Sequence, residues 1–232
     1  MKDHTEPSAV RSVRGPARCA VTTLALAGAA WAARAVWQIR LAAAGQPSSG
    51  PPEQGGGRHR PLTALENTYH FVSSLGDAAT VLCAIAFLMW LSRARDNARA
   101  LSGERPRRAW PWVYAGWIVP VVNLWVPRGI VVDIHRASAP GERLPRVVNW
   151  WWGLWLAGSL SGVGLMYTES ADGVIARAYT DLPFLLTADT AVVGAAVAGV
   201  LVVRTLTGTQ RERLPGTVPH RADPVSPARR AV

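Results

Sequence analysis

The chain has 232 residues, of which 49% are hydrophobic and 17% are charged, and its mean hydropathy is +0.11. Twenty-five basic residues against 15 acidic ones give a net charge of +10, and Lys2 is the only lysine. This composition excludes a disordered chain, and two cysteines are too few for a disulfide-stapled mini-protein. The apolar residues occur in long blocks rather than in short amphipathic periods, which disfavours an ordinary soluble domain.

The chain begins with a polar, basic head, residues 1–18, which is followed by an Ala-rich apolar segment, residues 19–41. About 20 apolar residues at a rise of 1.5 Å each cross a bilayer, so this segment is the first predicted spanning helix. A cleaved signal peptide is the alternative interpretation, because basic residues precede small apolar ones. Residues 45–61 are rich in Gly, Pro and Ser and predict a flexible linker outside the cell.

Three further segments have the length and the apolar content of a membrane span: residues 69–91, 149–168 and 182–203. The tail, residues 207–232, carries several prolines and arginines and is predicted to be disordered. Residues 19–206 are therefore predicted to form one membrane domain of the all-α class, a polytopic bundle with four spanning helices.

A fifth apolar stretch, residues 110–126, is interrupted by Pro120 and Asn123 and is followed by Pro127. Because proline removes a backbone donor and clashes with the preceding turn, this stretch predicts a re-entrant or interfacial segment instead of a straight helix. Residues 128–138 follow, with apolar Ile130, Val131 and Ile134 on one side and Asp133, His135 and Arg136 on the other. This pattern predicts a short amphipathic helix on the inner membrane surface.

The distribution of basic residues decides between two topologies, because cytoplasmic loops are enriched in arginine. If residues 110–126 do not cross, 20 basic residues lie inside and three lie outside; if they cross, the counts are 11 and 12. The first arrangement is favoured, which predicts a multi-pass protein of the inner membrane with both termini in the cytoplasm. Whether residues 110–126 enter and return or cross the bilayer is left open by the pattern alone.

The predicted cytoplasmic side is both basic and rich in tryptophan. The tryptophans flank the ends of the predicted spans and are expected to form an aromatic belt at headgroup level. The basic face there is expected to attract anionic lipid headgroups, and its candidate residues are Arg93, Arg95, Asn97, Arg107 and Arg108.

Three charged residues fall inside the predicted spans: Arg34, Asp77 and Asp189. Counted from the outer end of each span, all three lie about 10–12 Å deep. A charge at this depth is unfavourable unless it is paired, so the three side chains predict an ion-paired cluster in the bundle interior. The alternatives are side chains that reach the interface, or a spare carboxylate that carries a proton or a cation.

The sequence contains no recognisable catalytic constellation. Its five histidines are scattered without metal-ligand spacing, and Cys19 and Cys83 are each isolated in an apolar segment. The Gly-rich run at residues 55–57 does not follow a strand, so it is not a nucleotide-binding loop. We therefore expect no enzymatic activity, no metal and no cofactor. The basic isoelectric point is explained by membrane topology and does not predict nucleic-acid binding.

Several ordered residues resemble a family of uncharacterised membrane proteins common in actinobacteria, the domain of unknown function 4328. The resemblance covers most of residues 69–203. It rests on Trp90, Arg93, Arg95 and Asn97, then on Trp117, Pro120, Asn123, Leu124, Trp125 and Pro127, followed by Ser138, Trp151 and Trp152. His135 stands where a tryptophan is expected in this family. The resemblance implies a membrane location and a helical fold, and it implies no chemistry.

We expect an integral membrane protein that acts as a non-enzymatic accessory or interaction protein. Its expected partners are the lipid bilayer and either another membrane protein or a second copy of the chain. The alternative is a proton- or cation-coupled transporter or channel subunit that uses the intramembrane aspartates Asp77 and Asp189. A pH-dependent ion flux in liposomes would favour that alternative.

Overall fold

A computed structural model of the chain describes residues 11–50, 52, 60–103, 111–119, 121–162 and 170–213. In this part of the chain the regular elements are helices, and no strand is present. The prediction of an all-α fold is therefore confirmed. Pro120, Arg107 and Arg108 lie outside the described residues, as do residues 163–168 of the third predicted span and the tail from residue 214.

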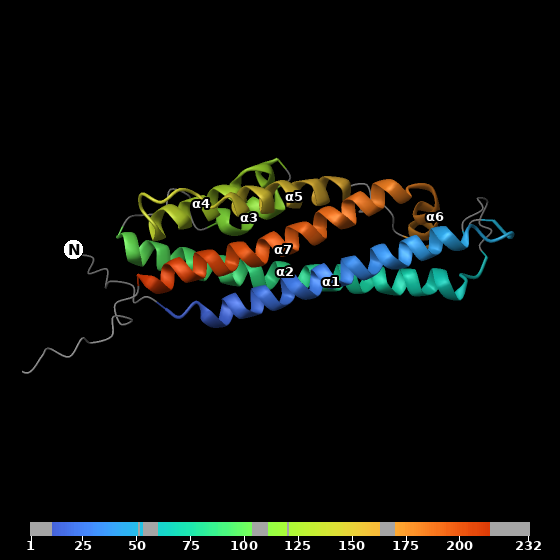
Figure 1. The fold of residues 1–232 in the computed structure, drawn as a ribbon, viewed down its shortest axis with the longest axis horizontal. Helices are drawn as coiled ribbons and strands as arrows, with labels where there is room; N and C mark the ends of the chain where they lie inside the picture. The colour runs from blue at the N-terminus through green and yellow to red at the C-terminus, as the bar shows by residue number, and fades with distance from the viewer. Residues whose placement is uncertain are drawn as a thin grey trace, which may run out of the picture.

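Three long helices run the length of the molecule: α1 (Arg14–Ala44), α2 (Ala64–Ser102) and α7 (Leu182–Glu212) (Figure 1). Each is long and apolar enough to cross a membrane. Helix α1 runs antiparallel to α2 and α7, so its start lies near the ends of the other two (Figure 1). The third predicted span, residues 149–168, corresponds in part to α5 (Arg146–Gly162), which has 17 residues, so a count of four spanning helices is not established.

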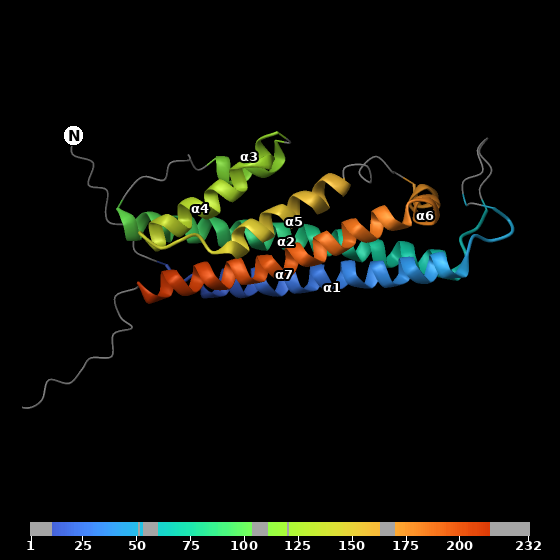
Figure 2. The same cartoon turned by 45° about the horizontal axis from the view of Figure 1, so that its top comes forward.

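Shorter helices lie at both ends of the bundle that the three long helices form. Helices α3 (Trp112–Ile118) and η1 (Val122–Leu124) lie in the broken segment, residues 110–126. Helix α4 (Val126–Ser138) follows it and lies at the end where α2 and α7 finish (Figure 2). Helix α6 (Ala171–Thr180) lies at the opposite end, where α7 begins. We call these the α4 end and the α6 end.

Local sequence signals set the boundaries of α2. The Thr63 side chain accepts a hydrogen bond from the Glu66 backbone N–H, while the Glu66 carboxylate accepts one from the Thr63 backbone N–H, which is a capping box. Gly103 follows the helix in the left-handed conformation, with φ of 69°, and its N–H donates to the Arg99 carbonyl. The helix is therefore longer at both ends than the apolar block that predicted it.

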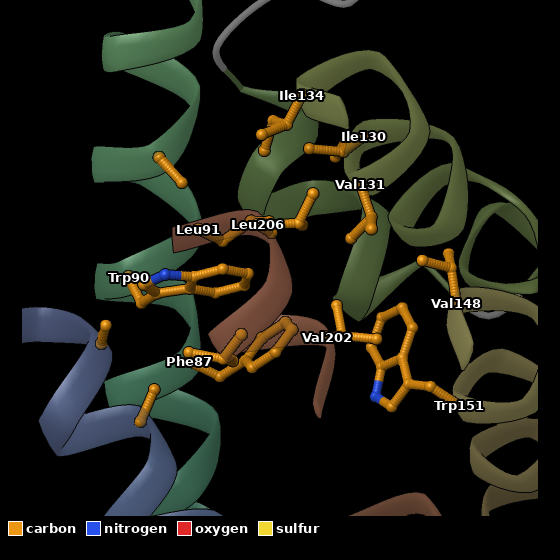
Figure 3. Packing of buried hydrophobic residues seen from close by; sticks show 14 of the residues in the cluster. Phe87, Trp90, Leu91, Ile130, Val131, Ile134, Val148, Trp151, Val202 and Leu206 are labelled. Atoms are coloured by element: carbon orange, nitrogen blue, oxygen red, sulfur yellow. The ribbon is translucent and has the colours of Figure 1, made fainter. Parts of the chain in front are cut away.

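The main apolar core lies at the α4 end (Figure 3). It combines side chains from α1, α2, α3, α4, α5 and α7, among them Phe87, Trp90 and Leu91 of α2, Ile130, Val131 and Ile134 of α4, Val148 and Trp151 of α5, and Val202 and Leu206 of α7. A second, smaller cluster at the α6 end contains Leu41, Tyr69, Ile175 and Ala178. Helix α4 thus contributes one face to the interior of the bundle.

The structure differs from the sequence pattern at His135 of α4. The pattern puts His135 on the polar side with Asp133 and Arg136, but in the structure it is 2% exposed. The reason is tertiary: α4 packs against α2 and α7, so the covered part of its surface is wider than the stripe formed by the aliphatic residues.

Small residues bring the long helices together. A Cβ atom added at Gly158 of α5 would lie 2.7 Å from Val192 Cγ2 of α7, and one added at Gly28 of α1 would lie 3.1 Å from the Ala196 Cβ of α7. Close approach of this kind is how helices gain packing contacts in lipid, where apolar association has little driving force. Helix α7 is therefore packed tightly on both α1 and α5.

Candidate functional site

Arg34 of α1 and Asp189 of α7 form an ion pair in the interior of the bundle. Arg34 Nε donates to Asp189 Oδ1 at 3.1 Å and to Oδ2 at 3.3 Å, and Arg34 Nη2 donates to Oδ1 as well. The two side chains are 6% and 1% exposed. The Trp31 ring lies 4.3 Å from the guanidinium carbon and adds a cation–π contact. The pair neutralises both buried charges and joins the first long helix to the last.

Gln38 lies one turn beyond Arg34 on α1 and was not singled out by the sequence. Residues four apart share a helix face, so Gln38 points toward the same interior as Arg34. Its side chain is fully buried, and neither Nε2 nor Oε1 has a hydrogen-bond partner among the described residues. The sequence signal for this position is a glutamine in an Ala-rich apolar helix, four residues after an arginine.

Asp77 does not join this pair. It is exposed on α2, and it forms no hydrogen bond or ion pair with any described residue. The structure thus brings together two of the three charged residues that the sequence placed at one depth. The depth follows from residue counting, whereas the direction of Asp77 depends on how α2 is rotated against α1.

A second charged network lies at the α6 end, outside the predicted spans. The Arg60 guanidinium donates to both oxygens of Glu66, whose side chain is fully buried, and the Tyr179 hydroxyl donates to Glu66 Oε1 at 3.1 Å. Arg60 Nε also donates to the Gly50 carbonyl at 2.7 Å. These contacts tie the linker after α1 to the start of α2 and to α6.

The hydrogen bonds of this network shift two pKa values. The hydrogen bonds from Arg60 and from Thr63 outweigh burial and lower the pKa of Glu66 to about 2. Burial, followed by the hydrogen bond to Glu66, raises the pKa of Tyr179 to about 12. Glu66 is therefore ionised and Tyr179 is protonated at neutral pH. Sequence reasoning missed this network because Glu66 and Tyr179 are 113 residues apart.

At the α4 end neutral hydrogen bonds join α2 to α7, and the Arg128 guanidinium of α4 donates to Asn149 Oδ1 of α5 at 3.1 and 2.7 Å. Trp90 Nε1 donates to Thr207 Oγ1 at 3.1 Å, and Gln210 Nε2 donates to the Ala94 carbonyl at 2.7 Å. Asn97, assigned by sequence to an exposed basic face, is 3% exposed, and its amide bonds both the N–H and the carbonyl of Arg11. The carboxamide fixes the entry to α1 instead of facing water.

The other predicted residues of the basic face and of the broken segment differ in their burial. Arg93 and Arg95 are partly exposed near the end of α2. Pro127 is buried in the first turn of α4. The Asn123 Oδ1 atom is buried and has no hydrogen-bond partner among the described residues. The broken segment is thus packed on the bundle only in part: Val113 is buried, whereas Val121 and Trp125 are 63% and 53% exposed.

The tryptophans differ in burial, and their position in a belt at headgroup level stays a prediction. Phe87 lies at the centre of a cluster, with ring centroids 5.2 Å from Trp90, 5.7 Å from Trp117 and 5.6 Å from Trp151. Trp150, in contrast, is 68% exposed. Part of the aromatic set therefore forms the core of the α4 end, because several helices meet there and large rings fill the space between them.

The described residues contain no group of three His, Cys, Asp or Glu side chains that could hold a metal ion. Cys19 and Cys83 are both free thiols. Arg34 binds Asp189 and Arg60 binds Glu66, and the expectation of no metal and no cofactor stays a prediction.

Comparisons with curated proteins and with solved structures give no match. A comparison with protein families gives a match to a domain of unknown function, DUF4328, over residues 62–208. This region begins just before α2 and ends within α7, so it contains Asp189 and the broken segment but leaves out α1 with Arg34. The match covers more than half of the chain, and the protein therefore belongs to the DUF4328 family.

Proposed function

We propose that this protein is an integral protein of the inner membrane that acts as a non-enzymatic accessory or interaction partner of other membrane components. Its three long apolar helices support insertion into a bilayer. Large apolar side chains are exposed on all three of them, for example Ile39 of α1, Ile85 of α2 and Val197 of α7. Side chains of this kind are favourable against lipid or against another membrane protein, and unfavourable in water.

The observation that carries the proposal is the closed ion pair in the interior. A carrier of protons or cations needs a carboxylate that can exchange its ligand. Asp189 is instead held by two nitrogen atoms of Arg34, and both side chains are buried. Together with the close helix packing at Gly28 and Gly158, this favours a rigid scaffold over a conduit.

The proposed orientation puts the α4 end in the cytoplasm. It rests on the arginine distribution, and it agrees with the start of α1 and the end of α7 lying at the same end of the bundle (Figure 1). The basic residues near that end, with Arg93 and Arg95 among them, would face anionic lipid headgroups.

A single cysteine in the loop after α4 tests this orientation. Gly141 has φ of 87°, which disfavours a cysteine, so the exposed neighbour Glu142 is the better position. Glu142→Cys is made in a chain carrying Cys19→Ser and Cys83→Ala, and intact cells are treated with a membrane-impermeant thiol reagent. We expect labelling only after the cells are opened. Labelling of intact cells would overturn the orientation.

The interaction role is tested by cross-linking in native membranes followed by affinity purification of the full chain. Wild type is compared with Asp77→Asn and Asp189→Asn. We expect a reproducible protein partner in the wild-type sample. Recovery of only this chain and lipid would overturn the interaction role.

Gln38 favours the transporter alternative, because its buried amide has no hydrogen-bond partner among the described residues next to the ion pair. That alternative predicts a pH-dependent ion flux in liposomes that both Asp189→Asn and Gln38→Leu abolish. We expect no flux above that of protein-free liposomes.

A further inference from the structure

Asp77 lies in the middle of an apolar, outward-facing surface of α2. The neighbouring side chains Phe71 and Val81 are 61% and 60% exposed, and Ser74 and Asp77 are exposed between them. We call these four residues the Asp77 face. Asp77 is eight residues from Tyr69, which corresponds to about 12 Å along the helix. The carboxylate is thus well below the end of the predicted span, with apolar side chains on both sides of it.

The chain itself supplies no donor to this carboxylate from its described residues. The hydroxyl of Ser74 donates to the His70 carbonyl at 3.0 Å, and that of Thr80 donates to the Gly76 carbonyl at 2.8 Å. Arg34 acts on the Asp77 carboxylate through space, but its guanidinium donates its hydrogen bonds to Asp189. A carboxylate that faces hydrocarbon without a partner is strongly unfavourable, so such residues in membrane helices pair with another group.

A second copy of the chain is a poor partner for this surface. A symmetric dimer with its axis along the membrane normal brings identical residues to the same depth, so it would bring the two Asp77 carboxylates close together. Like charges at one depth in a medium of low polarity repel each other. The complementary occupant carries the opposite charge.

We propose that the Asp77 face binds a transmembrane helix of a different membrane protein, and that this helix carries an arginine or a lysine at the depth of Asp77. The inference rests on the proposed interaction role and specifies where the partner binds and by which chemistry. Apolar contacts with Phe71 and Val81 would flank the ion pair on both sides, in the way that buried polar groups set the register of paired helices.

The test uses the full-length chain in its native membrane with a photo-cross-linking amino acid at Val81. The matched control is the same amino acid at Val197 of α7, since both valines are 60% exposed. We expect a cross-link from position 81 to a second protein, at a peptide with an arginine or lysine within about one helical turn, and none from position 197. Asp77→Asn is expected to reduce the yield about tenfold, which is the size of effect of one interhelical polar contact in a membrane.

Charge exchange makes the assignment specific. Asp77→Arg should abolish the cross-link, and an aspartate in place of the partner's basic residue should restore it. Cross-linking from position 81 only to lipid, only to a second copy, or with an undiminished yield in Asp77→Asn would overturn the inference. Equal melting of wild type and Asp77→Asn in detergent shows that the variant is folded.

Failure of binding at the Asp77 face can be distinguished from failure of the proposed interaction role. If affinity purification recovers a partner equally from wild type and Asp77→Asn, and position 81 meets only lipid, the protein has an interaction role through another surface and the Asp77 face does not bind. If no partner is recovered from wild type, both proposals fail.

Discussion

At the α6 end the long helices are joined by charged side chains, whereas at the α4 end they are joined by aromatic and aliphatic ones. Arg34 with Asp189 and Arg60 with Glu66 connect α1, α2, α6 and α7 through ionic hydrogen bonds. The cluster around Phe87 connects α2, α4, α5 and α7 through packed rings and branched side chains. Ionic contacts are directional and fix rotation and register, while apolar packing fills volume where more helices meet.

This contrast predicts that the largest single loss of stability arises at the buried ion pair. Arg34→Leu leaves the Asp189 carboxylate buried without its partner, so we expect the free energy of unfolding to fall by about 3–5 kcal/mol. Adding Asp189→Asn should restore part of the loss. Thermal unfolding in detergent measures both variants.

The control for this prediction is Arg40→Leu, which removes an exposed arginine stacked on Trp37 at 4.5 Å. A change below about 1 kcal/mol is expected there. Additive losses in the Arg34→Leu and Asp189→Asn double variant would show that the two residues do not act as a pair.

At the α4 end the corresponding test is Phe87→Ala. The ring is 6% exposed and packs on three tryptophans, so its removal leaves a cavity and is expected to cost about 3 kcal/mol. The loss should be the same at pH 5 and pH 8, because no charge is involved. Met89→Ala, on the same helix with a 51% exposed side chain, is the control and should melt close to wild type. If the loss of unfolding free energy in Phe87→Ala depended strongly on pH, the apolar character of the α4 end relative to the α6 end would be contradicted.

Acid sensitivity should come from the α6 end. Because the pKa of Glu66 is lowered to about 2 in the folded state, its stabilising effect is present above the unfolded pKa of about 4.3 and is lost as the pH falls toward 2. Glu66→Gln should therefore lose about 1–3 kcal/mol at pH 7, and its unfolding should depend less on pH between 5 and 2. Melting curves across this range measure the effect. Glu142→Gln, an exposed change at the α4 end, should leave the acid sensitivity of wild type intact.

The smallest effect is expected for Tyr179→Phe, which removes one hydrogen bond to Glu66. A loss of about 0.5–1.5 kcal/mol at pH 7 is expected. Because the pKa of Tyr179 is raised to about 12, the stabilisation is complete below about pH 10 and is lost as the pH rises through 12. Unchanged melting at pH 7 would mean that Arg60 and Thr63 alone hold the Glu66 carboxylate.

The sequence by itself predicted the parts of this protein that depend on length, spacing and backbone chemistry. Long apolar blocks predicted α1, α2 and α7, because a helix must satisfy its own backbone in lipid. Prolines predicted that residues 110–126 do not form one straight helix, and α3 ends at Ile118. Counting residues gave Arg34 and Asp189 a common depth, which is a property of a fixed rise per residue.

The tertiary structure alone decided which way side chains face. Asp77 has the same predicted depth as Asp189, yet it is exposed, because Gly76 and Thr80 of α2 turn toward Trp31 of α1. His135 is buried because two helices cover α4, and Glu66 meets Tyr179 across 113 residues. Rotation of one helix against another and contacts between distant segments depend on how all the helices pack together, and no local pattern in the chain encodes them.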